Sequence, residues 1–137
     1  DDVFIAWREI ALTEKRGGES LTWLVVGYRD QIVFSDAGAR IKFANFRRDA
    51  QTGYQIPRLI QIDGEDGQDS VRLVIRAEQA RRVDLLEEHG ALVRLFASAV
   101  TEPYQYVFDG DYEMQMTIEG ATARVDGSVE FSMDYLN

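Results

Sequence analysis

The stretch YEMQMTIE, residues 112–119, decides the fold, because every second side chain in it is apolar and the side chains between are polar. Residues 129–135 alternate in the same way, and so do residues 71–76 apart from Val74. Successive side chains of a β-strand point to opposite faces, so each stretch predicts a strand with one apolar face. Such strands are typical of antiparallel sheets that bury one face.

Turn signals separate the apolar stretches. Glycine pairs and aspartate–glycine sequences tolerate the positive φ that tight hairpins need. They occur at Gly17-Gly18, Asp36-Ala37-Gly38, Asp63-Gly64, Asp66-Gly67, Asp109-Gly110 and Asp126-Gly127. The expected strands are residues 3–14, 20–28, 31–35, 40–47, 55–63, 70–77, 104–109, 112–119, 121–126 and 128–136. Many short strands punctuated in this way predict one all-β domain over residues 1–137, an antiparallel lipocalin-like (calycin-type) barrel of about 8–10 strands.

The segment 78–100 fits two interpretations. Residues 78–88 are good helix formers followed by Gly90, whereas apolar side chains spaced by two later in the segment fit strands. A barrel with one short helix and a barrel with two extra strands both remain open. Pro57 and Pro103 cannot donate a ladder hydrogen bond, so each is expected at a sheet edge or a strand start.

The composition excludes several classes of function. The 137 residues carry 24 acidic against 15 basic side chains, a net charge of −9. This charge opposes binding to nucleic acid and to anionic membranes. The chain has no cysteine, which excludes disulfides and thiolate chemistry. No apolar run approaches the roughly 20 residues of a membrane-spanning helix, and no signal peptide is expected.

Two polar features are interpreted as solvated structure. The single histidine, His89, lies between two glutamates and a glycine, which predicts an exposed turn residue rather than a lone general base. Residues 63–69 are rich in carboxylates, but their spacing does not match a calcium-binding loop, so a solvated hairpin is the better interpretation. We therefore expect neither a metal site nor a cofactor.

Aromatic residues occur in nearly every expected strand and predict an apolar ligand site. A small barrel with inward aromatic side chains holds one apolar ligand. The residues expected to line such an interior are Trp23, Tyr28, Tyr54, Tyr104 and Tyr106. A solid core with tyrosines at its rim is the alternative.

Carboxylates in such an interior would be candidate acids, because burial in an apolar pocket raises the pKa of a carboxyl group. Asp30 and Asp109, at expected strand ends near the barrel mouth, are the favoured candidates. The other carboxylates that interrupt or flank apolar runs are Glu9, Glu113, Glu130 and Asp134, of which the last three face away from the apolar side by alternation.

Three stretches resemble the carotenoid 1,2-hydratase (hydroxyneurosporene synthase) and AttH group of lipocalin-like proteins. Residues 21–26, LTWLVV, resemble that group's tryptophan-bearing first strand. Residues 52–57, TGYQIP, are similar to its threonine/serine–glycine–tyrosine–proline stretch with two additional residues before the proline. Residues 102–108, EPYQYVF, with residues 127–131, GSVEF, resemble its closing strands.

The resemblance implies a fold and a range of ligands. The group has two lipocalin-like barrels, and this chain has room for one, resembling the C-terminal barrel. Members include hydratases and cyclases of isoprenoid or polyketide substrates, and lipid binders without activity. A one-barrel relative of the group is the alternative, and a homodimer or a missing second barrel are the partners to expect. No catalytic motif is clear enough to transfer a catalytic residue to this sequence.

Three functions follow from these observations. The first is binding of an apolar small molecule, such as a polyene or terpenoid, in the aromatic interior. The second is a hydratase or cyclase that uses acid–base chemistry in the same cavity. The third is a structural or interaction module with a solid interior, in which the edge beside Pro57 or the segment 78–100 meets a partner.

Overall fold

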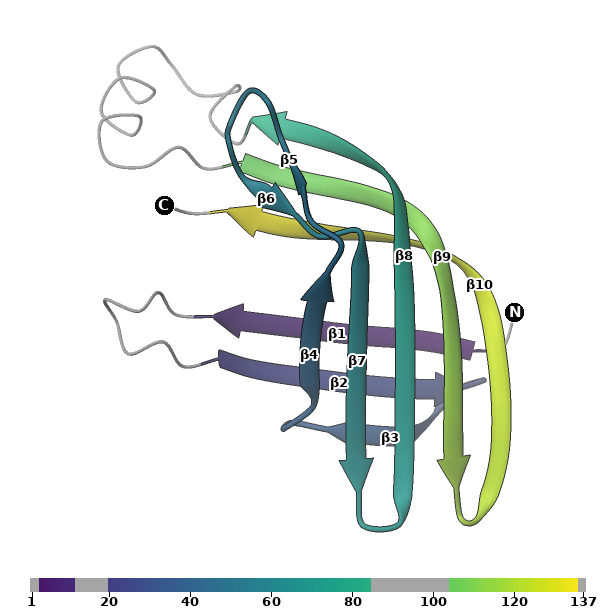
Figure 1. The fold of residues 1–137 in the computed structure, drawn as a ribbon. Coiled ribbons are helices and arrows are strands. Elements are labelled where there is room, and N and C mark those ends of the chain that lie inside the picture. Colours follow the sequence, from purple (N-terminus) through teal and green to yellow (C-terminus); the bar gives the residue numbers. More distant parts are fainter. Residues whose placement is uncertain (1–2, 12–19, 85–103, 136–137) are drawn as a thin grey trace.

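The computed structural model describes residues 3–11, 20–84 and 104–135, which form an all-β, antiparallel fold (Figure 1). The described strands are β1 (Val3–Ala11), β2 (Ser20–Tyr28), β3 (Gln31–Asp36), β4 (Arg40–Ala44), β5 (Arg47–Arg48), β6 (Gln55–Ile56), β7 (Leu59–Asp66), β8 (Asp69–Asp84), β9 (Tyr104–Ile118) and β10 (Ala121–Tyr135). The all-β class predicted from alternation is confirmed. Among these residues, no helix is long and apolar enough to cross a membrane.

The strands form two main layers. One sheet has the order β10-β9-β8-β7-β4, a second has the order β1-β2-β3, and β5 pairs with β6 in a short third ladder. Figure 1 shows the three-stranded sheet crossing the long, bent strands of the five-stranded sheet. Within the described ranges no backbone ladder joins these two sheets, so the closed cylinder expected from the sequence is not completed by hydrogen bonds there.

The main core lies between the two layers. Its buried members come from the inner faces of both sheets and, with Ala39, from the turn before β4: Leu24, Val26, Phe34, Ala39, Ile60, Ile62, Val71, Leu73, Ile75 and Met114. A second apolar cluster lies at the other end of β8 and β9 and contains Ile56, Ala77, Tyr106 and Phe108. At the main core Gly64 allows close packing, because a Cβ there would lie 2.9 Å from the ring of Phe34.

Three glycines expected at turns, Gly64, Gly110 and Gly127, lie inside strands, and Gly110 and Gly127 each join two expected strands into one. A Cβ at Gly110 would lie 2.2 Å from the carbonyl oxygen of Arg76 on β8, so glycine permits close backbone approach at a β-bulge. A Cβ at Gly127 would lie 3.0 Å from the ring of Tyr112, which packs across β10 from the neighbouring strand. Both glycines serve packing within the sheet rather than chain reversal.

The segment 78–100 is described only as far as residue 84. Residues 78–84 continue β8 past its register shift between Ala77 and Gln79, so of the two open alternatives the strand holds for these residues. Pairing with β9 up to Asp84 overrides their helix propensity. The remainder of the segment and Pro103 lie outside the described residues. Pro57 is buried in the link between β6 and β7, so the expected strand 55–63 is divided in two.

Candidate functional site

A cavity of about 1290 Å³ lies between β1 and β10, the strands at the edges of the two main sheets. Alternation along each strand turns one face towards it. The lining residues on these inner faces are Val3, Ile5, Trp7 and Glu9 on β1, Tyr112 on β9, and Val125, Val129, Phe131 and Met133 on β10, with Phe43, Leu73 and Ile75 behind them. The cavity exceeds the roughly 300–1,000 Å³ of ordinary small-molecule sites. It therefore offers room for a long apolar molecule.

A row of aromatic rings runs from this cavity into the second apolar cluster. The ring centroids of Trp7 and Phe131 are 5.9 Å apart. Phe131 stacks on Phe108 at 4.6 Å with nearly parallel planes, and Phe108 lies 6.4 Å from Tyr106. Phe131 thus borders both regions, and its ring separates open space from packed interior.

Glu9 is the acidic residue on the inner face of β1. It is half-buried, and partial burial raises the pKa of its carboxyl group above the ordinary value. No described side chain forms a hydrogen bond or ion pair with it. The other charged residues beside the cavity, Arg8, Asp126, Glu130 and Asp134, are exposed and lie on the outer faces of β1 and β10, so among the described residues Glu9 is the charged side chain on the inner faces of these two strands.

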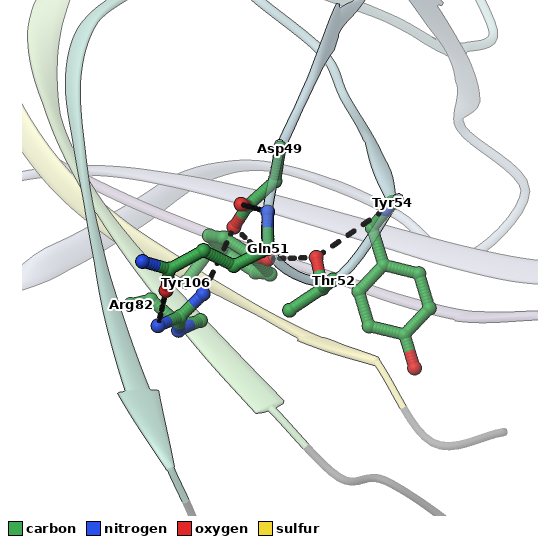
Figure 2. A network of polar contacts seen from close by, with 6 residues as sticks. All are labelled: Asp49, Gln51, Thr52, Tyr54, Arg82 and Tyr106. Carbon is green, nitrogen blue, oxygen red and sulfur yellow. Dashed lines mark hydrogen bonds and ion pairs between the residues drawn. The ribbon is translucent and has the colours of Figure 1, made fainter.

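The second cluster holds three of the five residues expected to bind a ligand, Tyr54, Tyr104 and Tyr106. The Tyr54 and Tyr104 rings meet edge to face, with centroids 6.4 Å apart. Tyr106 is almost completely buried, and its hydroxyl lies against the loop between β5 and β6 (Figure 2).

A network of hydrogen bonds surrounds the Tyr106 hydroxyl. The Tyr106 hydroxyl donates to Oδ2 of Asp49 at 2.5 Å and lies 2.7 Å from Oγ1 of Thr52. The backbone N–H of Gln51 donates to Oδ1 of Asp49 at 2.8 Å. Arg82, from β8, donates to the Gln51 side-chain oxygen and lies 3.5 Å from Oδ2 of Asp49. The network fastens the β5–β6 loop to β8 and β9.

The network also moves the pKa values of its acids. The hydrogen bond from Tyr106, followed by the one from the Gln51 backbone, lowers the pKa of Asp49. Burial, followed by the hydrogen bond to Asp49, raises the pKa of Tyr106. Both shifts favour a charged Asp49 beside a neutral Tyr106, which is an arrangement suited to holding structure together.

The other two expected ligand residues do not line the cavity. Trp23 is 42% exposed and lies on the face of β2 opposite to Leu24 and Val26. Tyr28 ends β2 and is 43% exposed, with the guanidinium of Arg29 5.1 Å from its ring centroid. The expected inward orientation is corrected for Trp23, whereas Tyr28 lies opposite Val3 on the inner side of the sheet but at the exposed end of its strand. Residues 21–26 are apolar at nearly every position, so alternation could not assign a face there.

The favoured acids also lie away from the cavity. Asp30 is exposed in the turn between β2 and β3. Asp109 is exposed on the outer face of β9, opposite Glu130 on β10. The outward direction expected for Glu113, Glu130 and Asp134 agrees with their exposure. Glu9, which the sequence included only as a secondary candidate, is the one of these six carboxylates on the inner face.

The carboxylates expected in a solvated hairpin have protein partners. Asp63 lies 2.7 Å from Arg72, and Glu65 lies 2.7 Å from Arg40. Oδ1 of Asp69 accepts a hydrogen bond from the backbone of Glu119. Within the described part of the chain no group of three or more potential metal ligands comes together. His89 lies outside the described residues.

Sequence reasoning did not single out the cavity residues Trp7, Val129 and Phe131 as a site. A signal was present, because Val3, Ile5 and Trp7 share one face of the first strand and Val129, Phe131 and Met133 share one face of the last. What alternation could not supply was the pairing of the two faces, since that depends on how the sheets cross.

One curated protein provides a comparison. The ceramide-binding protein SVF1 from Yarrowia lipolytica (strain CLIB 122 / E 150) is 23% identical over 129 residues, which cover 82% of this chain and 32% of that protein. This chain therefore spans about a third of the length of its curated relative. No family model matches the sequence, and no solved structure matches it.

Proposed function

We propose that this protein binds a neutral, ceramide-like lipid in the cavity between β1 and β10. The observation that carries the proposal is the cavity itself, which is large and has apolar inner faces supplied by two sheet edges. The similarity to a protein named for ceramide binding supports the same class of ligand. The proposal places the ligand beside Trp7 and Phe131 rather than beside the tyrosines of the second cluster.

The lining suits hydrocarbon chains. Val125, Val129 and Met133 on β10 and Val3 and Ile5 on β1 line the cavity, so a chain between the strands contacts apolar atoms of both. Burying each methylene group contributes about 0.8 kcal/mol. Two additional methylenes are therefore expected to tighten binding by up to about tenfold, until the cavity is filled.

The charges of the lining favour a neutral or cationic head group. A ceramide head group carries an amide N–H and hydroxyl groups, and the Glu9 carboxyl is available to accept hydrogen bonds from such donors. A fatty-acid carboxylate would meet the Glu9 carboxylate on the inner face of β1, where no described basic side chain lies to compensate. Like charges repel, so we expect anionic lipids to bind more weakly than neutral lipids of equal chain length.

Equilibrium binding of radiolabelled N-acylsphingosines to the purified 137-residue chain tests this proposal. Val129→Phe places a ring in the cavity and is expected to weaken binding at least tenfold. Val107→Phe is the matched control, because Val107 lies on β9 with its side chain on the other face of the sheet. Both variants must keep the melting temperature close to that of the parent. Equal affinity of Val129→Phe and Val107→Phe would contradict this site.

An isoprenoid or polyene ligand is the competing identity, consistent with the resemblance of the sequence to carotenoid hydratases. The same cavity would hold it. Competition between retinol and the labelled ceramide at one site separates the two classes, since the tighter ligand displaces the other. If retinol binds more strongly than every N-acylsphingosine tested, the ligand class is isoprenoid rather than ceramide-like.

A hydratase or cyclase is a second candidate function, favoured by the inward position and raised pKa of Glu9. Glu9 in its protonated form would transfer a proton to an alkene carbon of a bound isoprenoid. Water, or a second alkene of the substrate, would then attack the resulting cation, and its surplus proton would return to the carboxylate. Turnover of an isoprenoid by the parent chain that is lost in Glu9→Gln supports this candidate, and no turnover in the parent removes it.

A further inference from the structure

The outer face of the three-stranded sheet is unusually apolar for an exposed surface. It is formed by Phe4, Ala6, Arg8 and Ile10 on β1, Leu21, Trp23, Val25 and Gly27 on β2, and Ile32 and Ser35 on β3. Five of these are large apolar side chains that are 42–66% exposed: Phe4, Ile10, Leu21, Trp23 and Ile32. Contiguous exposed apolar patches mark interaction sites, whereas scattered single residues do not.

The register of the ladders makes this face continuous. Ile10 lies opposite Leu21, and Arg8 lies opposite Trp23. Phe4 lies opposite Gly27, and its ring occupies the place of a Gly27 side chain, since a Cβ there would come within 1.9 Å of Phe4. The rings and aliphatic side chains therefore form one surface rather than separate projections.

The charge of this face differs from that of the whole protein. The chain has a net charge of −9, yet the outer face as described carries one charged residue, Arg8, and no carboxylate. Glu9 and Asp36, the acidic residues of β1 and β3, lie on the other face, Asp36 opposite Leu24. A cation among apolar and aromatic side chains matches the interface of a phospholipid bilayer, where phosphate groups lie above hydrocarbon.

Arg8 favours a phospholipid surface over a second copy of the chain as the partner of this face. A symmetric dimer through this face would bury two guanidinium groups near its centre, and the described residues of the face contribute no carboxylate to pair with them. An unpaired buried charge is strongly destabilising. At a bilayer surface Arg8 extends to a phosphate while its neighbours enter the hydrocarbon boundary.

We propose that the outer face of the three-stranded sheet docks on the surface of a phospholipid bilayer. The proposal goes beyond ligand binding and rests on different residues. The two surfaces nevertheless share β1, whose inner face lines the cavity and whose outer face meets the lipid. Docking would place the side of the cavity that β1 lines close to the membrane.

The net charge specifies the kind of bilayer. A charge of −9 opposes approach to an anionic membrane, and the single Arg8 does not offset it. Insertion of apolar side chains must therefore dominate. We expect binding to phosphatidylcholine vesicles that changes little with salt and weakens when anionic phosphatidylserine is added.

Vesicle flotation and tryptophan fluorescence test this docking. In Trp7→Phe the single remaining tryptophan is Trp23, and vesicles of brominated phosphatidylcholine are expected to quench its emission. Leu21→Ser combined with Ile32→Ser should reduce the vesicle-bound fraction roughly tenfold. Phe46→Ser is the control, because Phe46 is 54% exposed but lies outside this face, after β4.

The outcomes separate the possibilities. Quenching of Trp23, with a loss on Leu21→Ser/Ile32→Ser and none on Phe46→Ser, supports the proposal. Absence of flotation, or equal loss in both variants, overturns it. A concentration-dependent dimer in sedimentation equilibrium that Trp23→Ser abolishes also overturns it and assigns the face to a second copy. Because these readouts use empty vesicles and no cavity ligand, they succeed or fail independently of ceramide binding.

Discussion

The second apolar cluster around Tyr106 and the cavity between β1 and β10 differ in how completely side chains fill them. Around Tyr106 the rings are in contact, the hydroxyl has a partner on Asp49, and Arg82 closes the network. Between β1 and β10 the side chains on the inner faces are mostly apolar and leave a large space, with Glu9 beside it. Phe131 belongs to both regions.

This difference separates a structural region from a binding region. Buried polar groups that have partners in the protein stabilise the fold and leave nothing for a ligand to satisfy. Apolar walls around open space are unfavourable until another apolar molecule covers them. Aromatic content alone therefore does not identify the site, since both regions contain aromatic rings.

The largest expected effect comes from truncating the packed region. Phe108 is fully buried and stacked on Phe131, so Phe108→Ala should lower the free energy of unfolding by about 3–5 kcal/mol. Val129→Ala, at the cavity, should cost about 1 kcal/mol or less, because its side chain already borders open space. Urea denaturation followed by circular dichroism measures both. Similar losses for the two variants would remove the distinction between the regions.

A smaller loss is expected on removing the Tyr106 hydroxyl. Tyr106→Phe deprives Asp49 and Thr52 of a buried partner, which should cost about 1–3 kcal/mol of unfolding free energy. Ceramide affinity should stay within twofold of the parent, since this hydroxyl does not line the cavity. Loss of affinity with unchanged stability would instead place the ligand among the tyrosines.

Alternation predicted most of the fold because it reflects one-sided burial. The expected strands 20–28 and 31–35 agree with β2 and β3 to within one residue. Some errors occurred at glycines that permit close packing instead of forming turns, and others at Pro57, which divides an expected strand, and in residues 78–84, which extend β8. Gly110 and Gly127 have the composition of turns but permit close contacts with Arg76 and Tyr112, which lie on neighbouring strands and are invisible to local sequence.

The site was less predictable than the fold. Tyr54, Tyr104 and Tyr106 were expected together and are together, although in the packed region. Trp23 faces outward, on the side of β2 opposite to Leu24 and Val26. Both faces of this strand are apolar, so its sequence did not indicate which face is buried. The cavity arises from two strands at opposite ends of the chain, and no local pattern fixes their separation.

The acid dependence of stability should report the Tyr106–Asp49 contact. The pKa of Asp49 is lowered on folding, so its contribution to stability is present above the unfolded pKa of about 3.9 and is lost as the pH falls through the lower folded value. In Tyr106→Phe the main cause of this shift is absent. The difference in unfolding free energy between parent and variant should therefore shrink on acidification from pH 6 to pH 2. A difference that stays constant across this range would show that the hydroxyl does not stabilise the charged carboxylate.

The smallest change in stability, and the most specific test of the cavity, is expected from Glu9→Gln. Burial raises the pKa of Glu9 on folding, so this group favours the folded state most below its unfolded pKa, about 4.3, and that contribution is lost as the pH rises through the folded value. The amide lacks this dependence, so Glu9→Gln should be equal to or slightly more stable than the parent at pH 7, within about 0.5 kcal/mol because solvent screens a half-exposed group.

The effect of Glu9→Gln on ligand binding should be larger and should depend on the charge of the ligand. Removing the negative charge of Glu9 from the inner face should improve binding of a fatty acid relative to a ceramide of equal chain length. Unchanged preference between the two lipids, measured at pH 7 in the same assay, would place the head group away from Glu9 while leaving the chain-binding walls of β1 and β10 intact.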